Sequence, residues 1–531
     1  MNQTFKVVFN KARGALMVVN EVTSCVQAKG TKTVIAAAVA ALAAGGVAAA
    51  EWVVAPGDLE SVGADQAWEN VKDKNRFDWA PVAQEEEPGT FLSTSEKKTF
   101  DKTLWVSGNN KYAQATGLGV SGADGNLTNA GTIYVTSGKD GVSWQNKGIW
   151  AGNGATATNA GVIVAKNAYG MTVGTEESGA NASKIVNKGT ISVVETGAGM
   201  ELGGVSGSTA VNAGLISVGA PTEEGDGGEL RFGHGVLINT AGNTFTNKGT
   251  IDVADVEMKE EGKLSAIEIK DKANNTTVNL EAGSAVNGEV HIAFGITGTV
   301  LNANGFKGEL ALNNDAVDTD DAKALTLNVK DGADLELKDG YGSVISEAVI
   351  ENGKLTASIW QSYTDADGKE ASDNIFKKVV VKEDGIFNVK QLNSGGTKDK
   401  SHDTLLIKGS EWTLDGGALQ VAGQNYTEAV KVGTADEKQA GSLTINSGDY
   451  SFTSLEIGKH GQTTVTGDLT VGALTLSGAT VADDNYAHVL VTENGSLTLN
   501  GALTAKGKYQ DVDDRRGVYV EGNLILGEEA N

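Results

Sequence analysis

The side chains with the most chemical potential in this chain are scattered rather than grouped. The only cysteine, Cys25, lies within the first fifty residues, so the remainder carries no disulfide, thiolate metal ligand or cysteine nucleophile. The histidines show no spacing typical of a metal site, and isolated surface histidines account for them. The pattern therefore predicts no metal and no cofactor. The five histidines are His234, His291, His402, His460 and His488.

Two acidic segments are the best candidates for catalysis. They are Glu223-Glu224-Gly225-Asp226 and Asp255-Val256-Glu257, and Arg231 and His234 lie near the first. Paired carboxylates are the groups that polysaccharide hydrolases use. However, acidic loops on an acidic protein are usually solvated, and few arginines are present to grip a polyanionic sugar. We therefore expect no enzyme, with a carbohydrate-active enzyme as the alternative. The arginines after residue 50 are Arg76, Arg231, Arg515 and Arg516.

Three other motifs fall short of their consensus. Gly204-Val205-Ser206-Gly207-Ser208 lacks the second glycine of a nucleophile elbow. Asp365-Ala366-Asp367-Gly368 resembles the start of an EF-hand, but Lys369 occupies the third ligand position. Asp318-Thr319-Asp320-Asp321 stands alone. We predict solvated turns at both acidic motifs.

Composition points to an all-β chain with many turns. The sequence has 70 glycines and 4 prolines without the three-residue period of collagen, and it is too rich in β-branched residues for disorder. The net charge is −25; without residues 1–50, which hold five basic residues and one acidic residue, 38 Lys and Arg face 67 Asp and Glu, near −29. Such a surface disfavours nucleic acid and anionic lipid as partners.

A short repeat defines the elements that must position these groups. An Asn-x-Gly step followed by an alternating apolar strand recurs at intervals of 30, 28, 25 and 35 residues. Asparagine and glycine tolerate the left-handed conformation, so we expect each step to be a corner. Stacked corners would also place the asparagine amides in a hydrogen-bonded ladder. The corner residues are Asn129 and Gly131, Asn159 and Gly161, Asn187 and Gly189, Asn212 and Gly214, and Asn247 and Gly249.

One strong corner per coil predicts a right-handed parallel β-helix, because stacked coils bury a continuous interior that one coil cannot form alone. Propeller blades or sandwiches are the alternative, but they would show antiparallel hairpins with two-residue turns. Later strands such as 324–329 and 441–446 alternate in the same way and indicate further coils with a different corner.

The predicted organisation has four parts. Residues 1–50 are an extended signal peptide, 51–110 an N-terminal cap, 111–290 the β-helix with Asn-x-Gly repeats, and 291–531 its continuation with looser repeats. The cap is expected because an open first coil would expose a sheet edge. An aromatic binding site is the alternative for that region, which contains Trp52, Trp68, Trp79 and Trp105.

The first fifty residues contain two apolar parts separated by polar and charged residues. A basic region with Lys29 and Lys32 precedes an apolar run from Val34 to Val47, and Ala48-Ala49-Ala50 before Glu51 offers an A-x-A cleavage site. A membrane anchor is the alternative, but the run is shorter than the roughly twenty residues that span a bilayer. No longer apolar run follows, so no membrane span is expected in the mature chain.

The run from Phe5 to Ala15 and the pair Val18-Val19 resemble the extended signal peptide region of large Gram-negative proteins secreted by type V routes. Phe9 and Asn20 depart mildly from that pattern. Together with the Asn-Gly corners and the Gly/Thr/Val strands, this resembles an autotransporter passenger of the adhesin class. The resemblance implies export through Sec and a type V route to the cell surface or the extracellular space.

Autotransporters end in a β-barrel, whereas residues 527–531 still resemble solenoid. The resemblance leaves three expectations: a truncated or split reading frame, a barrel on another chain, or a periplasmic protein. The absence of Asn-Pro argues against two-partner secretion and favours the first.

The function expected from the sequence is that of a non-enzymatic, adhesin-like passenger. It would present loops such as 219–235 and 360–375 on a rigid rod. Its partners would be the export machinery and a host-cell or matrix receptor or glycan.

Overall fold

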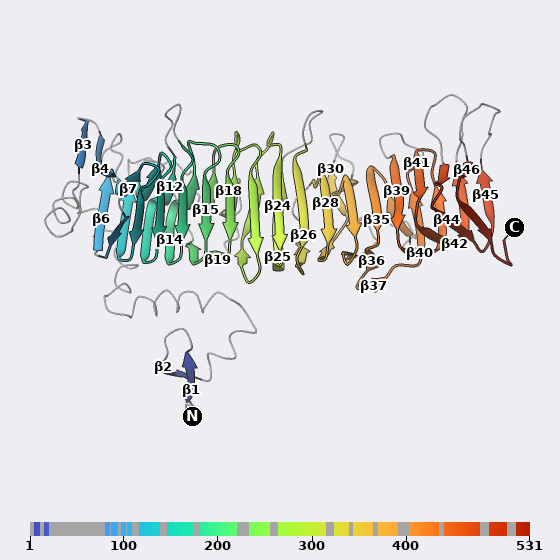
Figure 1. Cartoon of the computed structure of the whole chain (residues 1–531), viewed down its shortest axis with the longest axis horizontal. Coiled ribbons are helices and arrows are strands. Elements are labelled where there is room, and N and C mark those ends of the chain that lie inside the picture. Colours follow the sequence, from blue (N-terminus) through green and yellow to red (C-terminus); the bar gives the residue numbers. More distant parts are fainter. Residues whose placement is uncertain are drawn as a thin grey trace.

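The computed structural model describes residues 5–10, 15–20, 80–84, 87–93, 97–101, 103–108, 116–137, 146–174, 181–219, 233–254, 264–314, 323–338, 344–364, 370–390, 404–434, 440–477, 488–506 and 517–530. Every regular element in these ranges is a strand, and most strands stack side by side along an elongated rod (Figure 1). Each strand of the rod pairs in parallel with the strand one coil further along. The chain is therefore an all-β parallel β-helix, as the repeat predicts.

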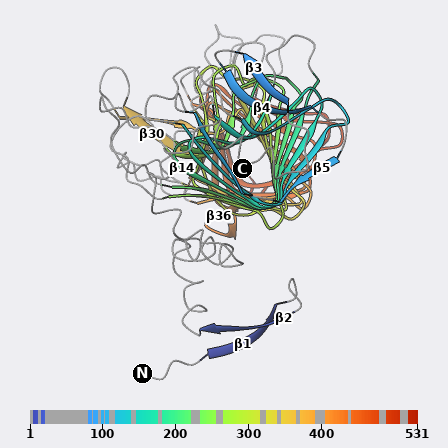
Figure 2. The same cartoon turned by 90° about the vertical axis from the view of Figure 1, so that its left-hand side faces the viewer.

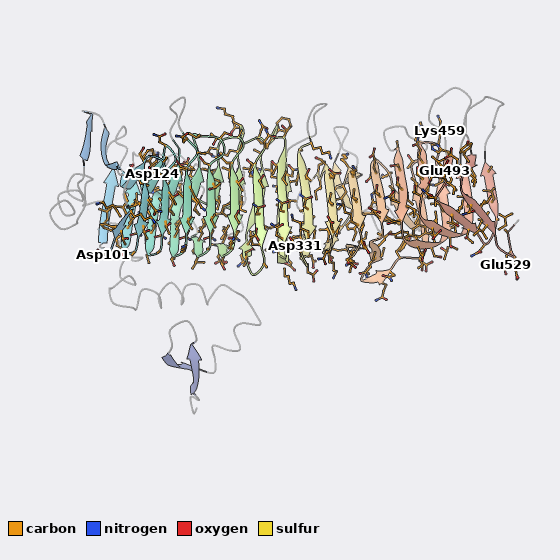
Figure 3. All side chains as sticks on the ribbon, in the orientation of Figure 1. Asp101, Asp124, Asp331, Lys459, Glu493 and Glu529 are labelled. Atoms are coloured by element: carbon orange, nitrogen blue, oxygen red, sulfur yellow. The ribbon has the colours of Figure 1, made fainter. Side chains whose placement is uncertain are left out.

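One wall of the rod is a 16-stranded sheet that runs along most of its length. Its strands are β5 (Lys97–Phe100), β8 (Asn126–Asn129), β11 (Thr156–Asn159), β13 (Lys184–Asn187), β15 (Thr209–Asn212), β18 (Thr244–Asn247), β21 (Thr277–Glu281), β24 (Thr299–Asn304), β26 (Leu325–Lys330), β28 (Glu347–Glu351), β32 (Lys378–Lys382), β35 (Ser410–Asp415), β39 (Gly441–Ser447), β41 (Gly461–Val465), β43 (His488–Val491) and β46 (Gly517–Val520). Figure 3 labels Asp101 and Asp331, which each directly follow a strand of this sheet, at the lower margin of the rod.

A 20-stranded sheet supplies the opposing walls. Long strands turn through both walls: β12 pairs with β9 through Val162–Lys166 and with β10 through residues 169–173, and the register shifts between the two segments. The strands are β3 (Ala80–Gln84), β4 (Glu87–Ser93), β6 (Thr103–Gly108), β7 (Thr116–Ser121), β9 (Thr132–Ser137), β10 (Lys147–Gly152), β12 (Val162–Val173), β14 (Thr190–Leu202), β16 (Leu215–Val218), β17 (Gly233–Ile238), β19 (Thr250–Val253), β20 (Ser265–Ile269), β22 (Ala285–Asn287), β23 (Glu289–Ile292), β25 (Lys307–Asn314), β27 (Asp334–Leu337), β29 (Lys354–Ala357), β33 (Ile386–Val389), β36 (Ala418–Val421) and β37 (Gln424–Asn425).

A seven-stranded sheet takes over near the C-terminal end of the rod. Seen along the rod, the coils superpose around one interior (Figure 2). The strands of this sheet are β34 (Thr404–Ile407), β38 (Ala429–Val432), β40 (Asp449–Ile457), β42 (Asp468–Ser477), β44 (Ser496–Leu499), β45 (Leu503–Lys506) and β47 (Asn523–Leu526).

Alternation of side chains builds the core. In β11, Ala157 and Asn159 are buried while Thr156 and Thr158 are half-buried on the outer side, and the same pattern recurs in the strands stacked on it. Each fully buried Ile or Leu contributes about 1.5–3 kcal/mol. Since every coil adds such residues to one continuous cluster, the interior extends along the rod.

Antiparallel hairpins accompany the coils. β3 pairs with β4, and β4 also pairs with β7 of the 20-stranded sheet. Parallel pairing already begins at β5 and β6, within the range 51–110 expected to form the cap. The other hairpins are β1 (Phe5–Asn10) with β2 (Ala15–Asn20), β30 (Trp360–Thr364) with β31 (Glu370–Asn374), and β36 with β37.

Candidate functional site

The asparagines of the repeated corner lie inside the rod, at the ends of five strands of the 16-stranded sheet. Each is 0 % exposed, and in each of the first four the Nδ2 donates a hydrogen bond to the Oδ1 of the asparagine one coil further along. The four donor–acceptor distances from Asn129 to Asn159, Asn187, Asn212 and Asn247 are 2.8, 2.9, 2.9 and 2.9 Å. We call these five residues the inner ladder; it has the hydrogen bonding that the repeat predicts.

The inner ladder leaves little hydrogen-bonding capacity unused. Asn159, Asn187 and Asn212 donate their second Nδ2 hydrogen to a backbone carbonyl of the next coil, and Asn247 donates one Nδ2 hydrogen in the same way. The accepting carbonyls are those of Thr190, Leu215, Thr250 and Ala285, at 3.1–3.2 Å. Phe100 stacks before the first rung and Leu280 after the last. Because buried amides are costly unless satisfied, this arrangement is structural.

The corner glycines serve a different purpose from the one predicted. Neither the ladder asparagines nor the glycines at 161, 189, 214 and 249 have a positive φ, so the expected left-handed corner is wrong here. A Cβ on Gly161 would lie 2.0 Å from the carbonyl oxygen of Gly131, and one on Gly189 would lie 2.0 Å from that of Gly161. Glycine is required because stacked backbones approach closely, not because the corner is left-handed.

A second group of polar side chains lies outside the main core, on strands β12, β14, β17, β20 and β23. Glu201 lies between the core residues Met200 and Leu202, so its side chain points away from the interior. Tyr169, Ala198 and Leu237 form a small apolar cluster on the same side. We call this set the buried stripe because its charged members are at most 9 % exposed. They are Glu201 (8 %), His234 (9 %), Glu268 (9 %) and Glu289 (8 %).

Hydrogen bonds between coils connect the members of the buried stripe. His234 Nδ1 lies 2.7 Å from the Ser265 hydroxyl, and His291 Nδ1 lies 2.9 Å from Glu268 Oε1. Side-chain amides donate hydrogen bonds to the other two carboxylates: Asn239 donates to Glu201 at 2.8 Å, and Asn313 donates to Glu289 at 2.9 Å. Each carboxylate therefore has a partner in the wall itself.

The environment of the stripe moves two carboxyl groups in opposite directions. Burial raises the pKa of Glu201 to about 7, against weaker opposing effects of Lys147 and the Thr172 and Asn239 side chains. For Glu268, burial raises the pKa, but the hydrogen bond from His291 and the charges of His234 and His291 together lower it. Burial lowers the pKa of His234 to about 4. Opposed pKa shifts are typical of acid–base pairs, although structural networks produce them too.

The expectation of isolated surface histidines is wrong for this part of the chain. His234 is buried beside Ser265, His291 contacts Glu268, and His460 is only 7 % exposed. Sequence reasoning missed the stripe because its partners are separated by 31 and 23 residues. Those separations are close to one coil, which is the signal that could have joined them.

Other predicted groups lie outside the described residues. These are Ala48, Ala50 and Glu51 of the cleavage site, the acidic segments 223–226 and 255–257, Arg231, the motifs 318–321 and 365–368, and most of the loop 219–235. Within the described ranges, Ser208 is 0 % exposed and accepts a hydrogen bond from the Ser183 amide. The described residues include no metal-binding group of His, Cys, Asp and Glu, and no helix among them could span a membrane.

Two family descriptions match the chain. The extended signal peptide of the type V secretion system matches residues 1–50, and the third pectate lyase-like domain of BigA matches residues 113–233. No curated protein and no solved structure matches. The second match covers the coils that carry most of the inner ladder and the first part of the buried stripe.

The signal peptide indicates export by the type V route to the cell surface or the extracellular space. The pectate lyase-like match agrees with the parallel β-helix of the described coils. Together, the extended signal peptide and the pectate lyase-like β-helix that follows it support an autotransporter passenger.

Proposed function

We propose that this passenger is a non-enzymatic, adhesin-like protein that binds a host-cell or matrix receptor or glycan along its rod. The observation that carries the proposal is the 16-stranded sheet, whose outward residues, most of them polar, stack in rows from coil to coil. Such an extended face allows a ligand or receptor to bind through many weak contacts along the rod. The buried carboxylates support a structural role, because each is tied to an amide or histidine of the wall.

The test is binding of the purified exported chain to cultured epithelial cells and to matrix-coated surfaces. An adhesin gives saturable binding and leaves the surface unchanged. Loss of material from the surface, with sugar fragments released into solution, would contradict the proposal. Bovine serum albumin at the same concentration controls for nonspecific adsorption.

A carbohydrate-active enzyme is the second candidate, and the buried stripe is the observation that favours it. Glu201 and Glu268 occupy one outward row, with Leu237 between them in the strand order β14, β17, β20. Two such steps are about 9.6 Å. One carboxyl with a raised pKa and another with a lowered pKa could act as acid and base. Release of reducing or unsaturated sugar ends, abolished by both Glu201→Gln and Glu268→Gln, would establish this alternative.

A further inference from the structure

A second row of asparagine amides lies on the outward face of the 16-stranded sheet. Asn302 Nδ2 donates to Asn279 Oδ1 at 2.8 Å, and Asn328 Nδ2 donates to Asn302 Oδ1 at 2.8 Å. Asn279 in turn donates to the Thr246 hydroxyl at 3.2 Å. We call Asn279, Asn302 and Asn328 the outer ladder. All three are half-buried, whereas the inner ladder is wholly buried.

The two ladders differ in how much hydrogen-bonding capacity they use. An asparagine amide has two donor hydrogens and an oxygen with two lone pairs. In the inner ladder the second hydrogen reaches a backbone carbonyl. In the outer ladder, Asn302 donates one amide hydrogen to Asn279 and accepts one hydrogen bond from Asn328. Among the described residues, none pairs with its second amide hydrogen or with the second lone pair of its oxygen. Each rung therefore presents a donor and an acceptor that face away from the core.

The rows beside the outer ladder extend this surface. On one side, Thr277, Val300 and Thr326 lie two residues earlier in the same strands and present methyl groups. On the other side, Asn304 Nδ2 donates to Glu281 Oε1 at 3.1 Å, and the Asn304 Oδ1 is buried from solvent, so this row adds the half-buried Glu281 carboxylate to the surface. The patch thus joins an apolar strip to a row of donors and acceptors.

These features match the chemistry of a sugar polymer. A pyranose ring has an apolar C–H face and hydroxyl edges that both donate and accept hydrogen bonds. Successive rungs lie about 4.8 Å apart, a step similar to one sugar unit of an extended chain. Glu281 and the net charge of −25 disfavour an acidic polymer.

We propose that the outer ladder binds a neutral, linear glycan that lies along the rod, with about one sugar unit per coil. This rests on the proposed adhesin function and names its ligand class. The amides bind hydroxyl groups, and the row of Thr277, Val300 and Thr326 contacts the apolar sugar face.

Isothermal titration of the full exported chain tests this with cellohexaose, mannohexaose and xylohexaose as neutral probes and hexagalacturonate as the acidic probe. The expected result is binding of at least one neutral hexasaccharide, with hexagalacturonate bound at least tenfold more weakly. Asn302→Ala should weaken binding about tenfold, since it removes the central rung. Thr444→Ala, at an outward position of β39, is the matched control and should change binding less than twofold.

Asn302→Thr provides a second variant that places a β-branched residue, which favours strands, at this position, and circular dichroism checks that both variants remain folded. The proposal is overturned if no neutral hexasaccharide binds, if the acidic probe binds as tightly, or if both folded Asn302 variants bind unchanged. Cell binding separates the two levels of the account. If both Asn302 variants adhere as well as the unaltered chain, the adhesin function stands and this glycan site is rejected. If the unaltered chain does not adhere at all, both the adhesin function and the glycan site are rejected.

Discussion

The coils of residues 126–254 and those of residues 325–415 stack by different means. The former, the asparagine coils, carry the buried inner ladder and glycines whose backbones touch between coils. The latter, the charged coils, turn through left-handed residues such as Asp331, Asn352 and Asp384. At the ends of strands in the 16-stranded sheet, the left-handed residues expected at the Asn-x-Gly steps are therefore found in the charged coils instead.

Outward charges mark the charged coils. Lys330, Glu351, Lys382 and Asp415 alternate in sign along one row, and Lys382 lies 3.1 Å from Glu351. At the other end of the same strand, Glu347 pairs with Lys323 and with Lys378. Burial alone would raise the pKa of Glu347, but these two lysines lower it overall. Exposed ion pairs contribute roughly 0–1 kcal/mol each, so they help to set register more than stability.

The difference shows that register can be fixed from inside or from outside the same fold. In the asparagine coils a slipped strand would leave buried amides without partners, which is costly. In the charged coils, the core residue Phe387 packs edge-to-face against Phe376 and at a tilt against Trp412, with ring centroids 5.4 and 5.3 Å apart. Apolar packing therefore supplies most of the stability of the charged coils, and the outward charges add a smaller preference for the correct register.

The largest effect is expected from breaking the inner ladder at its centre. Asn187→Ala removes bonds to Asn159, Asn212 and the Leu215 carbonyl and leaves those buried groups unpaired. We expect a loss of about 4 kcal/mol in the free energy of unfolding. Asn328→Ala on the outer ladder is the matched control and should cost less than about 1 kcal/mol. Urea denaturation monitored by circular dichroism measures both; equal losses would remove the distinction between the ladders.

A slightly smaller effect should come from the glycine stack. Gly189→Ala places a Cβ 2.0 Å from a backbone oxygen, so the coils must separate, at about 3 kcal/mol. Gly332→Ala, in a left-handed corner with nothing within 4 Å of the added Cβ, should cost about 1 kcal/mol through its φ of 75° alone. Thermal unfolding of both variants checks the order. A larger loss at Gly332 would show that conformation, not close approach, governs the glycines.

The pH dependence of the asparagine coils should reflect Glu201. Its folded pKa of about 7 lies above the ordinary value of 4.5 for a glutamate, so stability is lost as pH rises between these values. Glu201→Gln should remove this loss, raising the free energy of unfolding by about 3 kcal/mol at pH 8 with little change at pH 4.5. Denaturation at both pH values provides the measurement, with the exposed Glu493→Gln as control. A gain that is the same at both pH values would rule out titration as its cause.

His234 acts in the opposite direction in another pH range. Its folded pKa of about 4 lies below the ordinary value of 6.5 for a histidine, so its contribution to the free energy of unfolding is lost as pH falls between these values. The Glu201→Gln protein should therefore still lose stability on acidification.

The smallest effect is expected in the charged rows. Lys382→Ala removes a pair with Glu351 that is largely exposed and should cost less than about 0.5 kcal/mol. The difference from the unaltered protein should vanish in 1 M salt, where charges are screened within about 3 Å. Lys459→Ala, away from these rows, serves as the control in urea denaturation at low and high salt. A salt-independent loss would mean that the lysine stem, not its charge, matters.

The sequence predicts the fold and the inner ladder because both depend on a local repeat that recurs with each coil. Asn129 and Asn159 are recognisable from their Gly and strand neighbours alone. The buried stripe could not be found this way, since Glu268 and His291 belong to no repeated motif and meet only through register. The reason for the corner glycines was also hidden, because close approach between coils depends on stacking rather than on local conformation.

Hydrogen exchange resolved by mass spectrometry tests most directly whether the asparagine coils are held from inside. In the unaltered chain, the amides of β11, β13, β15 and β18 should exchange more slowly than those of β26 and β28. In Asn187→Ala, protection should fall across β11 to β18 and stay unchanged in β26 and β28. Protection that is unaffected by Asn187→Ala, or lost equally along the whole rod, would contradict the account.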